Sequence, residues 1–271
     1  MKKLKPWLGV SVLFCMNALA AGSADYCSKP IRLAMFEYGV LYRNSKGDGV
    51  DPRLLDILAK RSGCRFEKVL MPRARIWVEL QGGTLDMATA AIPTPERKAL
   101  GYLLPYMVTR NQVLVRKGSA PTPNDMDAFE RSNLSMAAVR GFRHEPAYDA
   151  MLSRLVVQGR VKEVPDTADL LRYLDRGMVD AVLSQPIVFR EYLAAETLKN
   201  DIAIRDWAPK DQASVGAFIL SRKSFTAEQA RRWDRLIVSM LEDGSILKIY
   251  REFLPQREAK EMMYTGPRDP E

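Results

Sequence analysis

Three arginines lie where a predicted strand gives way to a predicted helix. They are Arg73, Arg97 and Arg143. In open α/β sheets, ligands bind beyond the carboxyl ends of the strands. An arginine at that edge can form two parallel hydrogen bonds to a carboxylate or a phosphate. Each arginine alone could be a solvated surface group, but the three together favour a site for an anion.

Arg97 belongs to the stretch around which the chain is organised, residues 86–97. Residues 87–92 are small and apolar, as in a strand covered on both faces. Thr94 is the expected N-cap of a helix, with Pro95 in its first position. Arg97 stands where a capping box would place Glu or Gln. Arg97 and the free backbone N–H groups could hold an anion, or Arg97 could lie on a solvated helix face; the spacing alone favours neither.

No other motif indicates catalysis. The only histidine is His144, and the chain contains no cluster of His and Cys that would bind a transition metal. Nucleophile-elbow, phosphate-loop and dinucleotide-binding glycine patterns are missing, and no carboxylate pair is recognisable as acid and base. We therefore expect no catalytic residues, no metal and no cofactor.

The N-terminus has the pattern of a secretory signal peptide. Three lysines precede an apolar run at residues 7–16, and Ala18-Leu-Ala20 is a cleavage motif. The run is too short to span a membrane. We expect cleavage after Ala20, a periplasmic location for residues 21–271, and loss of Cys15 with the signal.

The charge of the mature chain is moderate. Removal of the signal's three lysines lowers the formal net charge from +8 to +5. No basic cluster is interleaved with aromatic residues as in a nucleic-acid-binding module, so we expect no nucleic-acid partner. An anionic ligand is compatible with this charge, although the charge does not require one.

The two cysteines that remain after cleavage are Cys27 and Cys64. Each precedes a predicted strand, at residues 31–35 and 65–70. If these strands are parallel neighbours, the two thiols lie at the same end of the sheet, within bridging distance. An even pair in an exported chain predicts a disulfide; two free thiols are the alternative.

Strands and helices alternate along the chain, which predicts parallel sheets covered by helices on both faces. Gly83-x-x-Asp86 recurs as Gly177-x-x-Asp180 in the same helix–strand context, which suggests two similar lobes. Further strands are expected at residues 87–92, 113–115, 134–139, 161–164, 181–183, 202–204 and 215–220. Helices are expected at residues 51–62, 74–81, from 94, 146–158, 168–176, 187–198, 227–242 and 246–253, followed by a frayed tail at 264–271.

Residues 31–255 resemble the family-3 extracellular solute-binding proteins, the periplasmic receptors of polar amino-acid ABC transporters. Each motif is weak alone, but their order and spacing are specific. The motifs are Gly83-x-x-Asp86, Thr94-Pro-Glu-Arg97, Leu104-Pro-Tyr106, Val139-Arg-Gly141, Gly177-x-x-Asp180-Ala181, Val215-Gly216 and Asp243-Gly244-Ser-x-x-Lys248-Ile-Tyr250.

The resemblance implies a two-lobe α/β fold of the type II periplasmic-binding-protein kind. Each lobe is a mostly parallel sheet covered by helices, and a two-strand hinge joins the lobes. Lobe 1 would contain residues 24–112 and 216–271, including the C-terminal tail, and lobe 2 residues 113–215. The hinge would lie near residues 111–113 and 214–216 and close the lobes over a ligand.

The resemblance also implies roles for single residues. Arg97 corresponds to the arginine that holds the ligand's α-carboxylate, and Thr94 to the hydroxyl residue of the same turn. Phe36, Glu37 and Tyr38 end the first strand, where the family has acidic and aromatic ligand contacts.

Three departures from the family pattern concern charge. The family's amine-binding acid falls at Gln185, a small hydroxyl residue falls at Arg143, and an aromatic that commonly covers the ligand falls at Arg73. Without a partner, a buried ammonium is costly. One lost carboxylate and two gained arginines predict an anionic ligand, with one acid group or more.

These inferences together predict a monomeric periplasmic solute-binding protein that captures a small polar ligand, an amino acid or a carboxylate, for an ABC permease. One alternative is a dehydratase of the cyclohexadienyl dehydratase type, in which an acid such as Glu37 protonates a leaving hydroxyl. Another is a ligand-binding sensor or accessory protein.

Overall fold

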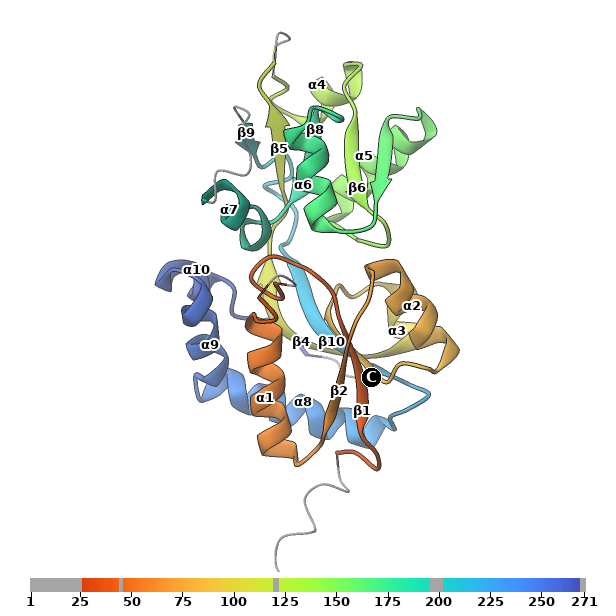
Figure 1. Ribbon diagram of the computed structural model, residues 1–271, viewed down its shortest axis with the longest axis vertical. Helices are drawn as coiled ribbons and strands as arrows, with labels where there is room; N and C mark the ends of the chain where they lie inside the picture. Colours follow the sequence, from red (N-terminus) through yellow and green to blue (C-terminus); the bar gives the residue numbers. More distant parts are fainter. Residues whose placement is uncertain (1–25, 44–45, 119–121, 195–201, 269–271) are drawn as a thin grey trace, which may run out of the picture.

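The computed structural model of the chain describes residues 26–43, 46–118, 122–194 and 202–268. The predicted signal peptide and the cleavage site after Ala20 lie outside these residues. The described residues form two lobes arranged along the long axis of the molecule, each built on one sheet (Figure 1). The expectation of a two-lobe α/β fold is therefore confirmed.

The lobe 1 sheet has the strand order β2-β1-β3-β10-β4. Its three N-terminal strands are parallel, whereas β10 is antiparallel to both of its neighbours. The strands are β1 (Ile31–Met35), β2 (Phe66–Leu70), β3 (Met87–Ala91), β4 (Gly101–Thr109) and β10 (Ser214–Ser221).

The lobe 2 sheet repeats this arrangement in the order β7-β6-β8-β5-β9. Strands β7, β6 and β8 are parallel, and β5 is antiparallel to β8 and β9. The chain crosses between the lobes from β4 to β5 and from β9 to β10 (Figure 1). The strands are β5 (Gln112–Arg116), β6 (Met136–Val139), β7 (Val161–Val164), β8 (Ala181–Ser184) and β9 (Ile202–Arg205).

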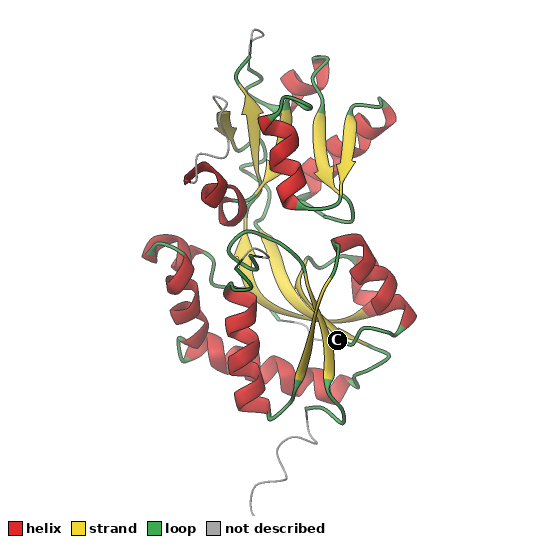
Figure 2. Ribbon diagram, in the orientation of Figure 1, coloured by secondary structure: helices red, strands yellow, loops and turns green. Residues whose placement is uncertain are grey.

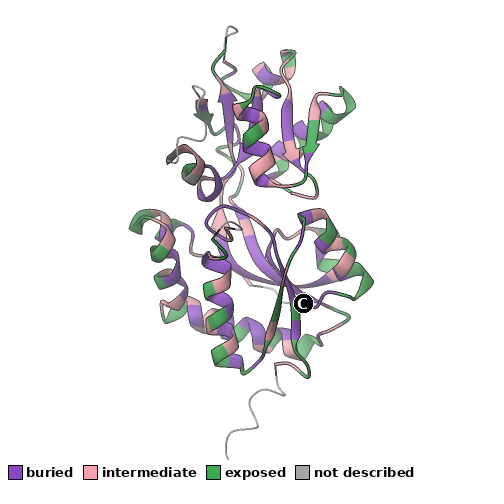
Figure 3. Cartoon of the chain, in the orientation of Figure 1, coloured by how far each residue is buried: buried purple, intermediate pink, exposed green. Residues whose placement is uncertain are grey.

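Helices surround both sheets (Figure 2). Buried residues concentrate on the strands and on the helix faces that contact them, and the outer helix faces are exposed (Figure 3). Lobe 1 has α1 (Val50–Ser62), α2 (Arg73–Gly82), α3 (Pro95–Leu100), α8 (Ala227–Glu242), α9 (Ser245–Phe253) and α10 (Gln256–Glu261); lobe 2 has α4 (Met126–Arg131), α5 (Pro146–Val157), α6 (Thr167–Asp175) and α7 (Pro186–Ala194).

The predicted disulfide between Cys27 and Cys64 is present, with a Cα–Cα distance of 6.1 Å. The parallel pairing of β1 with β2 brings the two cysteines together, because Ile31 lies opposite Phe66 in the register. The bond therefore joins the same end of two neighbouring strands, as the strand assignment predicted.

In lobe 1 the structure differs from the expectations at two places. The edge strand β4 was not predicted, and its place at the edge of the sheet accommodates Pro105, which lacks a backbone N–H. The tail from Tyr264 is not frayed as far as residue 268, since Tyr264 is buried and Arg268 forms an ion pair with Asp234 at 2.6 Å. The short helices α4 and α10 were also not predicted.

A buried polar network lies between α1, β4 and α9. The hydroxyl of Tyr106 donates to Asp51 Oδ1 at 2.9 Å, and the hydroxyl of Tyr250 donates to the Tyr106 carbonyl at 2.9 Å. Burial raises the pKa of Asp51 to about 6, although the Tyr106 hydrogen bond opposes this rise. Lobe 1 therefore contains a core carboxyl group that titrates near neutral pH.

This network predicts a pH dependence of stability. The pKa of Asp51 is higher in the folded protein than in an unfolded chain, where it is about 3.9. Its contribution to stability is therefore complete below about pH 4 and is lost as the pH rises through about 6. We expect the melting temperature of Asp51→Asn, relative to that of the unmodified protein, to be about 2 °C or more higher at pH 7 than at pH 5.

The exposed Asp56→Asn, on the same helix, is the matched control and should show no such change. A difference between the unmodified protein and Asp51→Asn that stays constant from pH 5 to pH 7 would contradict the prediction.

Candidate functional site

The predicted site residues lie on loops and helix starts that face each other across the gap between the lobes. Phe36, Glu37 and Tyr38 follow β1, and Arg73 begins α2. From lobe 2, segments after β6, β7 and β8 approach the same region. The carboxyl ends of parallel strands from both sheets thus meet at one interface.

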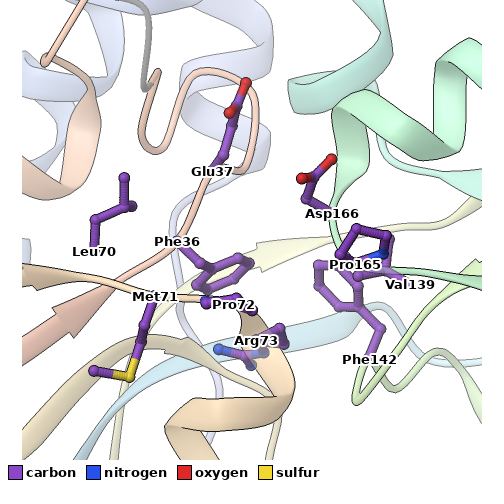
Figure 4. A pocket seen from close by; sticks show the side chains of 10 residues that line it. All are labelled: Phe36, Glu37, Leu70, Met71, Pro72, Arg73, Val139, Phe142, Pro165 and Asp166. Atoms are coloured by element: carbon purple, nitrogen blue, oxygen red, sulfur yellow. The ribbon is translucent and has the colours of Figure 1, made fainter.

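A cavity of about 250 Å³ lies at this interface, and we call it the cleft cavity. Its lining is mostly apolar or aromatic, with three charged residues, Glu37, Arg73 and Asp166 (Figure 4). The ten lining residues are Phe36, Glu37, Leu70, Met71, Pro72, Arg73, Val139, Phe142, Pro165 and Asp166. Both lobes contribute, so the cavity exists only when the lobes are close together.

Arg73 is buried, with 1% of its surface exposed. It donates to the carbonyl oxygens of Thr89 at 3.3 Å and Ala90 at 2.7 Å, while its Nε is buried without a hydrogen-bond partner. Ala90 has a φ of 52°, a conformation that side chains other than glycine rarely adopt. Arg73 therefore helps to hold a strained turn at the end of β3 and keeps an unused donor.

Trp77, which the sequence analysis did not single out, lies between two arginines. The guanidinium carbons of Arg73 and Arg97 are 4.6 Å and 4.0 Å from its ring centroid. Such contacts stabilise cations over an aromatic face. Trp77 is one helical turn beyond Arg73, and this spacing could have identified it.

Thr94 is the N-cap of α3, as predicted, because its Oγ1 accepts a hydrogen bond from the backbone N–H of Arg97 at 3.3 Å. The Arg97 guanidinium donates to the carbonyl oxygens of Ile92 at 2.9 Å and of Gly141, in lobe 2, at 3.0 Å. Arg97 does not line the cleft cavity in this structure. Burial lowers its pKa to about 8, with further lowering by the positive charges of Arg73 and Arg143.

Arg143 is the most exposed of the three arginines, with half of its side chain accessible and Asp149 Oδ2 3.9 Å away. Together with Tyr38 and Gln185 it lines a small space of about 20 Å³, separate from the cleft cavity. The structure thus places the three arginines in one region, but only Arg73 lines the cleft cavity, whereas Arg143 also lines an open pocket of about 300 Å³ on lobe 2.

Aromatic side chains fill much of the space between the lobes. Phe142 of lobe 2 lies 5.7 Å from Phe36 and 5.2 Å from Tyr38, measured between ring centroids. The Tyr38 hydroxyl donates to Gln185 Oε1, and both side chains are buried. The position at which the family resemblance places an amine-binding acid is therefore neutral and already bonded to Tyr38.

Further contacts hold the lobes together. Val40 N–H donates to the Ile187 carbonyl at 2.9 Å, and Thr167 Oγ1 donates to the Glu37 carbonyl at 3.3 Å. At Gly39, which has a φ of 52°, a Cβ would lie 2.1 Å from the Ile187 oxygen. Only glycine permits this approach of the two backbones.

Two carboxylates lie on opposite lobes beside the cleft cavity. Burial raises the pKa of Glu37 and so does the negative charge of Asp166, while a hydrogen bond with Tyr192 lowers it. Asp166 was not among the predicted site residues, because aspartate before a helix has a sufficient role as N-cap. Its Oδ1 does accept from Asp169 N–H at 2.8 Å.

In the described parts of the chain, no group of three or more His, Cys, Asp or Glu residues is placed to hold a metal ion. Within the same residues, no helix combines the length and the apolar character that crossing a membrane requires.

Comparison with known proteins supplies a family. The sequence model for the bacterial extracellular solute-binding proteins, family 3, matches residues 33–256. A search of curated protein sequences found no match.

Solved structures show the same fold at low sequence identity. An ancestral arginine-binding protein bound to arginine has a TM-score of 0.69 and 20% identity, with 83% of this chain and 98% of that chain covered. A histidine kinase sensor domain similar to periplasmic binding proteins has a TM-score of 0.71 and 15% identity, with 85% and 97% covered. An ancestral amino-acid-binding protein, a precursor of cyclohexadienyl dehydratase, has a TM-score of 0.67 and 19% identity, with 83% and 95% covered.

The contact between Tyr38 and Gln185 predicts an energetic coupling across the lobes. Tyr38→Phe leaves the buried Gln185 oxygen without its donor, which should cost about 1–3 kcal/mol of stability. Gln185→Met removes the acceptor. We expect the double variant to be less destabilised than the sum of the single variants by about 0.5 kcal/mol or more, measured by urea unfolding.

The cycle contains its own controls, because each single variant reports the cost of one side chain. Additive single effects would show that the two side chains do not interact in solution.

Proposed function

Because the chain belongs to the bacterial extracellular solute-binding proteins of family 3, we propose that it captures a small polar ligand with at least one acid group between its lobes. In this proposal the mature protein begins after Ala20 and acts in the periplasm as a monomer. It delivers the ligand to a membrane-embedded ABC permease. Its action is binding and lobe closure, without chemical conversion of the ligand.

One observation carries the acid-group proposal. Arg73 and Arg97 are buried, yet no carboxylate in the described chain forms an ion pair with either of them. Both bond instead to neutral backbone carbonyls, which leaves positive charge uncompensated. A buried charge without an opposite charge is unfavourable. A ligand carboxylate would supply the missing negative charge.

The contacts between the lobes support the receptor proposal. A ligand bound between the lobes would stabilise the same closed arrangement that these contacts stabilise. The Gly141 carbonyl already accepts from Arg97 across the lobes. A carboxylate would compete for this donor, so ligand binding and lobe position would be linked. A ligand-binding sensor would use the same motion, and a histidine kinase sensor domain has a fold similar to that of this chain.

The proposal predicts ligand-dependent stabilisation that requires Arg97. In a thermal-shift panel of amino acids, dicarboxylates and phosphorylated small molecules, compounds with acid groups should raise the melting temperature, because they bind the folded state. Native mass spectrometry of the undenatured protein should identify any ligand that copurifies. Arg97→Ala should abolish the shift.

Arg140→Ala is the matched control. Arg140 immediately precedes Gly141 in the chain, but it is exposed and forms an ion pair with Glu163 at 2.9 Å. A full thermal shift in Arg97→Ala, or a panel in which cationic compounds alone bind, would overturn the proposal.

A dehydratase is the second candidate, and Glu37 favours it. Burial and Asp166 raise the pKa of this cavity residue, which suits a proton donor. The fold is also that of the dehydratase precursor. We nevertheless expect no turnover of prephenate in an assay of product formation at pH 7. Turnover that Glu37→Gln abolishes would replace the receptor proposal with this enzyme.

A further inference from the structure

The cleft cavity has charges of opposite sign at its two ends. Arg73 lies at one end, and Glu37 and Asp166 lie together at the other, on opposite sides of the opening (Figure 4). Phe36 and Phe142 lie between these ends. A ligand that fills the cavity would therefore meet a positive group, then apolar surface, then two negative groups.

Among the residues that the structure describes, neither carboxylate has a positively charged partner. Asp166 uses Oδ1 to cap α6, and Glu37 is hydrogen-bonded to Tyr192. No lysine or arginine in the described chain forms an ion pair with either residue. The two acids come from different lobes, so lobe closure brings two negative charges toward each other. Beside an apolar cavity, water screens their repulsion less than it does in bulk solvent.

The opposite end carries an independent sign of a missing ligand group. Arg73 is 99% buried, and its Nε has no hydrogen-bond partner in the described chain. A buried donor of this kind is costly unless something accepts from it. Arg73 thus brings to this end of the cavity a positive charge that no carboxylate of the described chain pairs with.

The aromatic and aliphatic lining fits an apolar stem between these groups. Phe36 and Phe142 come from opposite lobes and meet edge to face. The rest of the apolar lining consists of Leu70, Met71, Pro72, Val139 and Pro165. Aromatic rings also favour a nearby cation, which would lie beside the two carboxylates.

The cleft cavity offers no acidic partner to an ammonium group that lies next to the ligand's carboxylate, as in an α-amino acid. The position where the family resemblance places its acidic partner is Gln185, which is buried, neutral and bonded to Tyr38. The only acids of the cleft cavity are at the end away from Arg73. The separation of charges in the cavity therefore differs from that in an ordinary α-amino acid.

We propose that the ligand carries its acid group at one end and a positively charged nitrogen at the other, and that this nitrogen binds between Glu37 and Asp166. The ligand class is that of ω-amino acids and related compounds, with an apolar stem that packs against Phe36 and Phe142. This inference rests on the proposed function, because it assumes that an acid group binds at the arginines.

The test compares four five-carbon compounds by isothermal titration calorimetry on the mature protein. They are pentanoate, glutarate, L-norvaline and 5-aminopentanoate, which differ only in the number and position of charged groups. We expect 5-aminopentanoate to bind most tightly, by about tenfold or more over pentanoate, which is the effect of one hydrogen bond to a charged group. Glutarate should bind less tightly than pentanoate, because its second acid would meet Glu37 and Asp166.

Two variants remove one negative charge each, Glu37→Gln and Asp166→Asn. Asparagine caps a helix as well as aspartate does, so Asp166→Asn keeps the α6 cap. Either variant should reduce the affinity for 5-aminopentanoate by about tenfold and leave that for pentanoate unchanged. Asp125→Asn is the matched control: Asp125 caps α4 in the same way, through Ala128 N–H at 2.7 Å, but lies outside the cavity.

The outcomes separate this inference from the proposed function. If acids bind through Arg97 but 5-aminopentanoate gains nothing over pentanoate, or if both variants bind it unchanged, the inference is wrong and the proposed function stands. Tighter binding of L-norvaline than of 5-aminopentanoate would also overturn the inference. If none of the four compounds binds, the inference fails, and the acid-group proposal is decided by the thermal-shift panel.

Discussion

Two hydrogen bonds from lobe 1 end at one carbonyl oxygen of lobe 2, that of Gly141. Trp77 Nε1 donates to it from 3.3 Å and Arg97 Nη2 from 3.0 Å. Gly141 has a φ of 80°, and a Cβ there would lie 3.1 Å from Ala74 Cα, so only glycine lets this carbonyl approach α2 so closely. The relative position of the lobes depends on this contact. It also occupies the arginine that the family resemblance assigns to the ligand, so ligand and lobe contact share one donor.

Charge in the cleft is distributed unevenly because the two lobes contribute different groups. Lobe 1 supplies Arg73 and Arg97, which both lie over the Trp77 ring, and lobe 2 supplies Arg143. Their mutual repulsion and burial explain the lowered pKa of Arg97. Away from them, Glu37 of lobe 1 and Asp166 of lobe 2 both line the far end of the cleft cavity (Figure 4). Closing the lobes without a ligand therefore brings like charges together in both places, and the contacts of Phe142, Tyr38 and Gln185 must offset this repulsion.

Much of the fold could be predicted from the sequence, because local patterns determine the elements. The helix at Ala227–Glu242 and the strands of both parallel triplets follow from apolar periodicity and caps. The repeated glycine–aspartate motif anticipated two sheets with one strand order. Strand β4 was not predicted; Pro105 is acceptable in it because the strand lies at the sheet edge, and no local pattern gives a strand's place in its sheet.

The sequence by itself determined which residues could reach the cleft. It also determined that arginines outnumber acids among the predicted ligand-binding residues. It also determined the disulfide, since both cysteines precede neighbouring strands. Only the tertiary structure decided which way these side chains point: Arg73 lines the cavity, Arg97 bonds to backbone carbonyls, and Asp166 joins Glu37 at the far end. Trp77 and Phe142 became visible for the same reason. Contacts between residues distant in the chain depend on lobe packing and rotamers, and no local spacing encodes them.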